Sequence, residues 1–302
     1  MSTEVTYDIT DDQVRELDRA VHRALEKRSI GELRTLGFGE LGVPLAWPGD
    51  DPTLCVKRLI GTDTKAESEF LFDRIRQYVT GLAPHMGVAP TELRLLTDDA
   101  GRWVTYLVQP ILPKAQLVET ILETAEPERD HPVVLAVRDA CVAAVDVGRA
   151  APDSQFSNFA WDGDTLTFFD VGTPFLFHPD GTFDEGFGAT LNTMPAILRP
   201  IGKREACRIS QEMGGRRGNM EHAAISIARM GLDDWLEPIV ATLNDVLDQP
   251  LDAATIRERT AKRHKDMIQL KKIMKLQRSW QTKVRRRPYD FFITDSWTGE
   301  II

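Results

Sequence analysis

The chain has 302 residues, of which 42% are hydrophobic and 27% are charged, which is typical of a globular protein with one large domain or two modest ones. Its formal net charge of −9 argues against general binding of nucleic acid by the whole molecule. The spacing of the three cysteines, Cys55, Cys141 and Cys207, matches neither a zinc site nor a disulfide framework. We also find neither a secretion signal nor an apolar run of about 18 residues. We therefore expect a cytoplasmic protein without a transmembrane segment.

The first third of the chain alternates helical and strand-like patterns. Residues 8–28 predict an amphipathic helix, because Thr10 can cap it and one face carries Val14, Leu17, Val21 and Leu25. Turn signals and apolar alternation predict strands over 32–39, 43–47, 53–60, 92–98 and 102–112, with a helix over 64–82. We therefore expect an N-terminal helical segment, 1–29, followed by a small sheet with one helix in residues 30–109.

After Pro113 the pattern becomes mostly helical. Residues 131–150 predict a buried helix, which leads into a loop over 151–158 and a short hairpin that turns at Asp162 and Gly163. Beyond about residue 186, helical segments alternate with loops. Residues 110–302 thus predict a second, mainly helical part of an α+β protein.

Three glycines, Gly37, Gly39 and Gly42, have a spacing that two unrelated nucleotide folds share. In a dinucleotide-binding fold this turn must run directly into a helix. Residues 43–49 contain two prolines and a glycine, which makes an immediate helix very unfavourable. The pattern favours a hairpin whose backbone N–H groups could approach phosphates, although an ordinary glycine-containing hairpin is an alternative.

A second cluster lies more than a hundred residues later. Asp153 is followed by Asn158 five positions on, and then, after the predicted hairpin, by the turn Asp170-Val171-Gly172. Together with the glycine hairpin, a lysine on the next strand (Lys57) and the order of elements, this resembles the protein-kinase-like superfamily. The resemblance covers about residues 30–180 and is closest to small-molecule kinases of the aminoglycoside phosphotransferase and choline kinase type. It implies a bilobal fold with a small antiparallel-sheet N-lobe (30–109) and a mainly helical C-lobe (110–302).

The resemblance also implies ATP and Mg²⁺ as cofactors and a hydroxyl group as phosphate acceptor. In the loop 151–158, Asp153 would orient that hydroxyl and accept its proton. Asn158, with Asp170 of the turn 170–172, would hold Mg²⁺ through oxygen atoms, the ligands this hard cation prefers. Lys57 would contact the α- and β-phosphates.

Other residues would surround the nucleotide. By the same resemblance, Gly37, Gly39 and Gly42 would cover the phosphates, and backbone groups near Val108, Gln109 and Pro110 would meet adenine. A glutamate on the helix 64–82 would fix Lys57. We favour Glu67, because it precedes Leu71 of the apolar stripe by one turn, and Glu69 is the competitor.

The cluster departs from the family pattern at one position and allows other interpretations. The family usually has a histidine two residues before the catalytic aspartate, where this chain has Ala151. Taken singly, Asp153 could cap a turn after Pro152, Asn158 could be a turn residue and Lys57 a solvated strand lysine. The acceptor is expected to be a small metabolite or natural product. The alternatives are Ser or Thr in a peptide or protein, or a pseudokinase that serves as a binding module.

The C-terminal region contains a strongly basic segment, residues 256–287, in an acidic protein. It predicts a helix docked by an apolar stripe at Met267, Leu270, Ile273 or Met274, and Trp280. Its basic face is either solvated or a surface for an anionic partner, such as an acidic peptide or protein, a phosphorylated substrate or anionic lipid; nucleic acid is disfavoured. Residues 214–219 predict a flexible basic loop. His178, His222 and His264 show no metal-site spacing and are expected to be structural or exposed.

Overall fold

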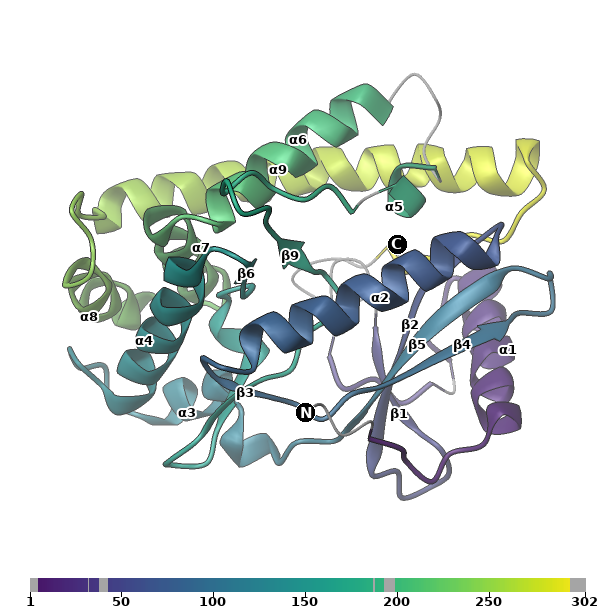
Figure 1. Cartoon of the computed structure of the whole chain (residues 1–302), viewed down its shortest axis with the longest axis horizontal. Helices are drawn as coiled ribbons and strands as arrows, with labels where there is room; N and C mark the ends of the chain where they lie inside the picture. The colour runs from purple at the N-terminus through teal and green to yellow at the C-terminus, as the bar shows by residue number, and fades with distance from the viewer. Residues whose placement is uncertain (1–4, 32, 38–42, 187, 193–198, 294–302) are drawn as a thin grey trace.

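The structure is a computed structural model that describes residues 5–31, 33–37, 43–186, 188–192 and 199–293. It is an α+β protein with a four-stranded antiparallel sheet in the order β1-β2-β5-β4 and a larger helical part (Figure 1). The strands are β1 (Pro44–Trp47), β2 (Leu54–Thr62), β4 (Glu92–Thr97) and β5 (Trp103–Pro110). These bounds confirm four of the five predicted strands. Of the predicted strand 32–39, the described residues form one bridge, Thr35 with Leu45.

Two helices cover opposite faces of this sheet. Helix α1 (Asp11–Lys27) is capped by Thr10 as predicted, and its residues Val14, Leu17 and Val21 pack against Val56 and Val108. Helix α2 (Lys65–Leu82) is capped by Thr64 and packs through Ile75, Tyr78 and Leu82 on the other face, with Leu59 and Leu107. Because side chains alternate along a strand, Lys57 shares the α2 face with Leu59, whereas Arg58 faces α1.

The helical part grows around one continuous apolar core that also includes α2. Helices α4 (Pro132–Val147), α7 (Arg216–Arg229) and α8 (Asp233–Asn244) contribute to this core. The predicted hairpin is present as β7 (Phe159–Trp161) and β8 (Leu166–Phe168), and β8 pairs in parallel with β3 (Gly87–Val88). The remaining elements of this part are η1 (Lys114–Gln116), α3 (Val118–Thr124), β6 (Ala150–Ala151), η2 (Phe156–Asn158), β9 (Phe175–Leu176), α5 (Gly188–Asn192) and α6 (Arg199–Met213).

The basic segment forms the long helix α9 (Ala253–Ser279), which continues as a π-helical turn (Trp280–Val284) and runs along one side of the molecule (Figure 1). Met274 is buried and Leu270 packs beside it, so the predicted stripe docks the helix there. Trp280 does not belong to that docked stripe, because its exposed fraction is 39%. The loop prediction for 214–219 is also wrong from Arg216 onward, where the chain already forms the first turn of α7.

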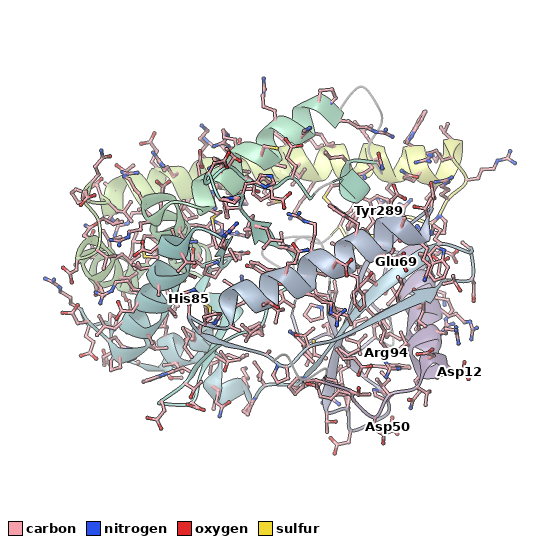
Figure 2. All side chains as sticks on the ribbon, in the orientation of Figure 1. Asp12, Asp50, Glu69, His85, Arg94 and Tyr289 are labelled. Carbon is pink, nitrogen blue, oxygen red and sulfur yellow. The ribbon has the colours of Figure 1, made fainter. Side chains whose placement is uncertain are left out.

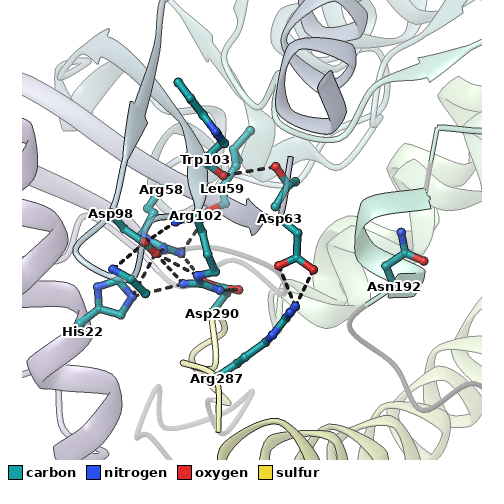
Figure 3. Close-up of polar contacts among 12 residues, drawn as sticks. His22, Arg58, Leu59, Asp63, Asp98, Arg102, Trp103, Asn192, Arg287 and Asp290 are labelled. Carbon is teal, nitrogen blue, oxygen red and sulfur yellow. Dashed lines mark hydrogen bonds and ion pairs between the residues drawn. The ribbon is translucent and has the colours of Figure 1, made fainter. Parts of the chain in front are cut away.

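The chain after α9 returns to the sheet. Tyr289 lies close to the beginning of α2 (Figure 2), and Tyr289, Phe291 and Ile293 pack with Ile60 and Met274. Asp290 enters a buried network of charges beside α1 (Figure 3). In the described part of the chain, no helix combines the length and the apolarity needed to cross a membrane.

Candidate active site

The structure brings together Lys57 and Asp170, which are 113 residues apart in the sequence. Lys57 projects from the middle of β2, and Asp170 follows β8. The Lys57 Nζ atom donates to Asp170 Oδ1 at 2.9 Å, and the two side chains are 18% and 26% exposed. Gly172 closes over this pair: a Cβ atom there would lie 3.5 Å from Nζ and only 3.3 Å from Leu107 Cδ1. A side chain at position 172 would therefore crowd the ion pair.

Asp153 lies in the loop between β6 and the short helix η2, and three side chains surround it. His222 Nε2 of α7 lies 2.9 Å from Asp153 Oδ1, and Gln155 Nε2 donates to Asp153 Oδ2 at 3.0 Å. Asn158 Nδ2 donates to the backbone carbonyl of Asp153 at 3.3 Å. The backbone N–H of Gln155 also donates to Asp153 Oδ1, at 3.4 Å, so this carboxylate caps its own turn as well.

The hydrogen bonds of His222 define its tautomer. Arg263 Nη1 of α9 lies 2.7 Å from His222 Nδ1, and a guanidinium can only donate. His222 Nδ1 therefore accepts from Arg263, and His222 Nε2 carries the hydrogen that is donated to Asp153. Because the imidazole is held from both sides, helices α7 and α9 together set the position of the Asp153 carboxylate.

The electrostatics of the site favour an ionised Asp153. Burial alone would raise the pKa of this carboxyl group, but the hydrogen bond from His222, followed by the hydrogen bonds from Gln155, holds its pKa below the usual value. The pKa of the Tyr78 hydroxyl group lies well above its ordinary value. Burial is the largest cause, the charge of Asp153 is the next, and the charge of Asp170 contributes further. Both carboxylates therefore lie on the side of the molecule where the buried hydroxyl group of Tyr78 bonds to the carbonyl of Ala151.

The glycine segment is a hairpin as far as it is described. The N–H of Leu36 donates to Pro44 O at 2.9 Å, and the N–H of Ala46 donates to Arg34 O at 2.8 Å. Residues 34–36 are thus antiparallel to β1, which begins at Pro44 as an edge strand and not as a helix. This geometry contradicts the dinucleotide-binding alternative. Gly37 lies at the start of the loop, whereas Gly39 and Gly42 lie outside the described residues.

Glu67 does not pair with Lys57. The Glu67 carboxylate accepts hydrogen bonds from Thr64 at 3.1 Å and from Asn192 at 3.2 Å, both at the exposed N-terminal end of α2. The competitor, Glu69, pairs with Lys65 at 2.7 Å. Both glutamates lie in the first turns of α2, and among the described residues Asp170 is the ion-pair partner of Lys57.

The predicted contact region for adenine is also displaced. Val108 and Gln109 lie inside β5, where they pair in register with Val56 and Cys55 of β2. The side chain of Gln109 instead donates to the carbonyl of Phe169 at 2.9 Å, one residue before Asp170. The chain leaves the sheet only after Pro110, so the connection between the sheet and the helical part is formed by residues 111–113.

Sequence reasoning missed His222 and Arg263. Neither residue belongs to a recognisable sequence motif. Their connection to Asp153 arises only because α7 packs against α9 in the folded chain. The role of His222 follows from its two partners in the folded chain, Asp153 and Arg263, which are 69 and 41 residues away in the sequence.

A second polar cluster lies on the other side of the sheet. Ligand atoms of Asp18, His22 and Asp98 lie within 4.8 Å of one another, a spacing that could hold a metal ion. However, Arg58 Nε lies 2.6 Å from Asp18. Figure 3 shows the second contact, in which Arg102 Nη2 lies 2.8 Å from Asp98. The guanidinium groups already neutralise these carboxylates, so the cluster acts as a structural charge network.

Comparison with known proteins identifies a family but no activity. No curated protein matches the chain. One family model matches residues 16–184, more than half of the chain. The match includes Lys57, Asp153, Asn158 and Asp170 but ends before His222 of α7. The chain belongs to this family, which is described as a family of unknown function (DUF6206).

Proposed function

We propose that this protein is an ATP- and Mg²⁺-dependent phosphotransferase that phosphorylates a hydroxyl group of a small metabolite or natural product. The proposal includes a bilobal, kinase-like arrangement of the sheet with α2 and the helical part. The observation that carries it is the Lys57–Asp170 ion pair of 2.9 Å, which is covered by Gly172 and joins residues 113 positions apart in the sequence. A strand lysine, a turn aspartate and a loop aspartate are the groups that phosphoryl transfer from a nucleotide requires.

The nucleotide would lie between the paired segments 34–36 and 44–46 and the Lys57–Asp170 pair. Lys57 would hold the α- and β-phosphates, and the backbone of the glycine loop would cover them. Because Val108 and Gln109 are paired within the sheet and the N–H of Ile111 donates to Thr53 O at 2.8 Å, residues 112–113 are the better candidates for contacts with adenine.

The oxygen atoms near the ion pair suit Mg²⁺. Asp170 supplies a carboxylate, and Asn158 supplies an amide whose nitrogen is already engaged by the carbonyl of Asp153. The amide oxygen of Asn158 is therefore the end that is left for a cation. Bound there, Mg²⁺ would neutralise the phosphate charge that develops during transfer.

Asp153 would act on the acceptor. Its carboxylate, held ionised and oriented by His222 and Gln155, would align the acceptor hydroxyl and take its proton while the hydroxyl oxygen bonds to the γ-phosphorus and the bond to the leaving nucleotide breaks. His222 and Arg263 would be positioning residues in this step, since their contacts run through Asp153 and not to the acceptor.

A second candidate is a pseudokinase, a nucleotide-binding module without turnover. One observation favours it: among the described residues no glutamate of α2 pairs with Lys57. Phosphorylation of Ser or Thr in a peptide is a variant of the first proposal, with the same site and a different acceptor.

Two measurements on the purified chain distinguish these functions. Thermal unfolding with ATP, with and without Mg²⁺, tests nucleotide binding, because a ligand that binds only the folded state raises the melting temperature. Transfer of a labelled γ-phosphate to pools of metabolites and peptides tests turnover. Metal-dependent stabilisation with transfer supports the enzyme, stabilisation without transfer supports the pseudokinase, and the absence of any stabilisation contradicts both.

A further inference from the structure

The outward face of α9 from Lys262 onward, continued through the π-helical turn that follows it, has an unusual composition for this protein. Over about 30 Å of helix it exposes five lysines and three large apolar side chains. We call it the lysine face, and its residues are Lys262, Lys265, Ile268, Lys272, Lys275, Leu276, Trp280 and Lys283. The exposed fractions of Ile268, Leu276 and Trp280 are 44%, 66% and 39%. At 100° per residue these positions fall on one continuous side of the helix, opposite the docked side that contains Met274.

The charges of this face are not compensated. In the described part of the chain, none of its five lysines forms an ion pair. Two lysines elsewhere on the surface are paired, Lys65 with Glu69 at 2.7 Å and Lys203 with Glu185 at 2.6 Å. A concentration of unpaired positive charge in a chain of net charge −9 marks a surface that complements an anion.

The pattern argues against a partner helix. A coiled-coil seam needs apolar residues at alternating spacings of three and four. Along the centre of the lysine face those positions are Lys262, Lys265, Gln269, Lys272, Leu276, Ser279 and Lys283, of which only Leu276 is apolar. The apolar side chains stand instead among and beside the lysines, where they can enter the boundary between lipid headgroups and acyl chains while the ammonium groups contact phosphates.

From these observations we infer that the lysine face of α9 docks the protein on an anionic lipid bilayer. A straight, convex helix face matches a flat surface, and a bilayer uses both the positive charge and the exposed Ile268, Leu276 and Trp280. Duplex nucleic acid would use only the positive charge and would leave the three apolar side chains without a partner. The inference does not depend on the proposed phosphotransferase activity.

Vesicle co-sedimentation of the full-length protein tests the inference. We expect the protein to sediment with vesicles in which about a third of the lipid is phosphatidylserine, not with pure phosphatidylcholine, and less as salt increases. Each lysine near such a surface contributes about a fivefold factor, so Lys272→Gln with Lys275→Gln should weaken binding about 25-fold. Leu276→Ser should weaken the binding that persists at high salt.

The matched control is the double variant Lys65→Gln with Lys203→Gln, which removes the same charge from paired sites. All the changes are on exposed side chains, and thermal unfolding verifies that each variant is folded. Normal vesicle binding by the control, with loss in the variant of Lys272 and Lys275, supports the inference. No binding by the unmodified protein, or equal losses in both double variants, would overturn it. Preferential loss of duplex DNA binding, with unchanged vesicle binding, would also overturn it and favour a nucleic-acid surface.

Discussion

The buried charge network beside α1 makes a quantitative prediction about how the C-terminal segment is held. Asp290 accepts from Arg58 Nη1 at 2.6 Å and from Arg102 Nη1 and Nη2 at 2.8 and 2.9 Å (Figure 3). The Asp290 and Arg58 side chains are each 5% exposed. Asp290→Ala removes one carboxylate partner from the buried guanidinium groups of Arg58 and Arg102. It also removes the contact by which the C-terminal segment is joined to them.

Breaking a buried ion pair by removing one partner costs about 3–5 kcal/mol. The same C-terminal segment offers a matched exposed pair, Arg287 with Asp63, whose side chains are 39% and 51% exposed. Solvent screens that pair, so Asp63→Ala should cost no more than about 1 kcal/mol. At about 2 °C per kcal/mol for a chain of this size, Asp290→Ala should lower the melting temperature by about 6–10 °C and Asp63→Ala by about 2 °C or less.

Urea unfolding followed by tryptophan fluorescence, together with thermal unfolding, measures both variants under identical conditions. The reasoning depends on the difference in burial, because both pairs join the same segment to the sheet. It is refuted if Asp63→Ala destabilises the protein as strongly as Asp290→Ala, or if Asp290→Ala changes the free energy of unfolding by less than about 1 kcal/mol.

Three further predictions concern the candidate site and the response to acid. Asp153→Asn should leave Mg²⁺-ATP stabilisation in thermal unfolding near normal and abolish phosphoryl transfer, whereas Asp170→Ala should reduce the stabilisation itself; equal loss of both properties in both variants would contradict these separate roles. His222→Ala removes a hydrogen bond to a charged group, worth about 1.5–3 kcal/mol, and should slow transfer about 10- to 150-fold while nucleotide stabilisation is unchanged. His222→Asn can still donate a hydrogen bond and should recover part of the rate. If neither change affects the rate, positioning by His222 is excluded. Burial raises the pKa of the Asp18 carboxyl, but the hydrogen bond from His22 and then the charge of Arg58 outweigh it, so the folded-state pKa lies below the unfolded value of about 3.9. Asp18 therefore stabilises the fold above that pH and loses this contribution as the pH falls below about 4, and urea titrations at several pH values should show a flatter acid limb for Asp18→Asn.

Several features of the molecule could be predicted because they depend on residues that are close in sequence. The cap at Thr10 begins a helix as expected, since a side-chain oxygen needs only the N–H groups of the next turn. Alternation along a strand is local in the same way, and it places Lys57 and Arg58 of β2 on opposite faces of the sheet. The hairpin at Asp162 and Gly163 followed from the turn residues alone, and Gly163 has the positive φ of 108° that this turn requires.

Other predictions were wrong because the side chain or backbone group in question bonds to a different partner from the one expected. Glu67 lies close enough in the sequence to the core stripe of α2 to suggest a contact with Lys57, but Thr64 and Asn192 engage it at the helix end. Gln109 was expected to present its backbone, yet β5 extends far enough to keep that backbone in the sheet. Trp280 fits the helical spacing of the stripe, but the π-helical turn that begins there changes the periodicity on which that spacing depends.

The amino-acid sequence by itself determined the α+β class, most of the elements and the set of lysine, aspartate and asparagine residues expected in one site, because propensities, caps and periodicity are local properties. Only the tertiary structure decided which side chains meet. The packing of α7 against α9 puts His222 between Asp153 and Arg263, and the return of the C-terminal segment to the sheet puts Asp290 between two arginines. Contacts of this kind join positions 41 to 232 residues apart, and no local pattern encodes them, since they arise from how whole helices and strands bury their apolar faces together.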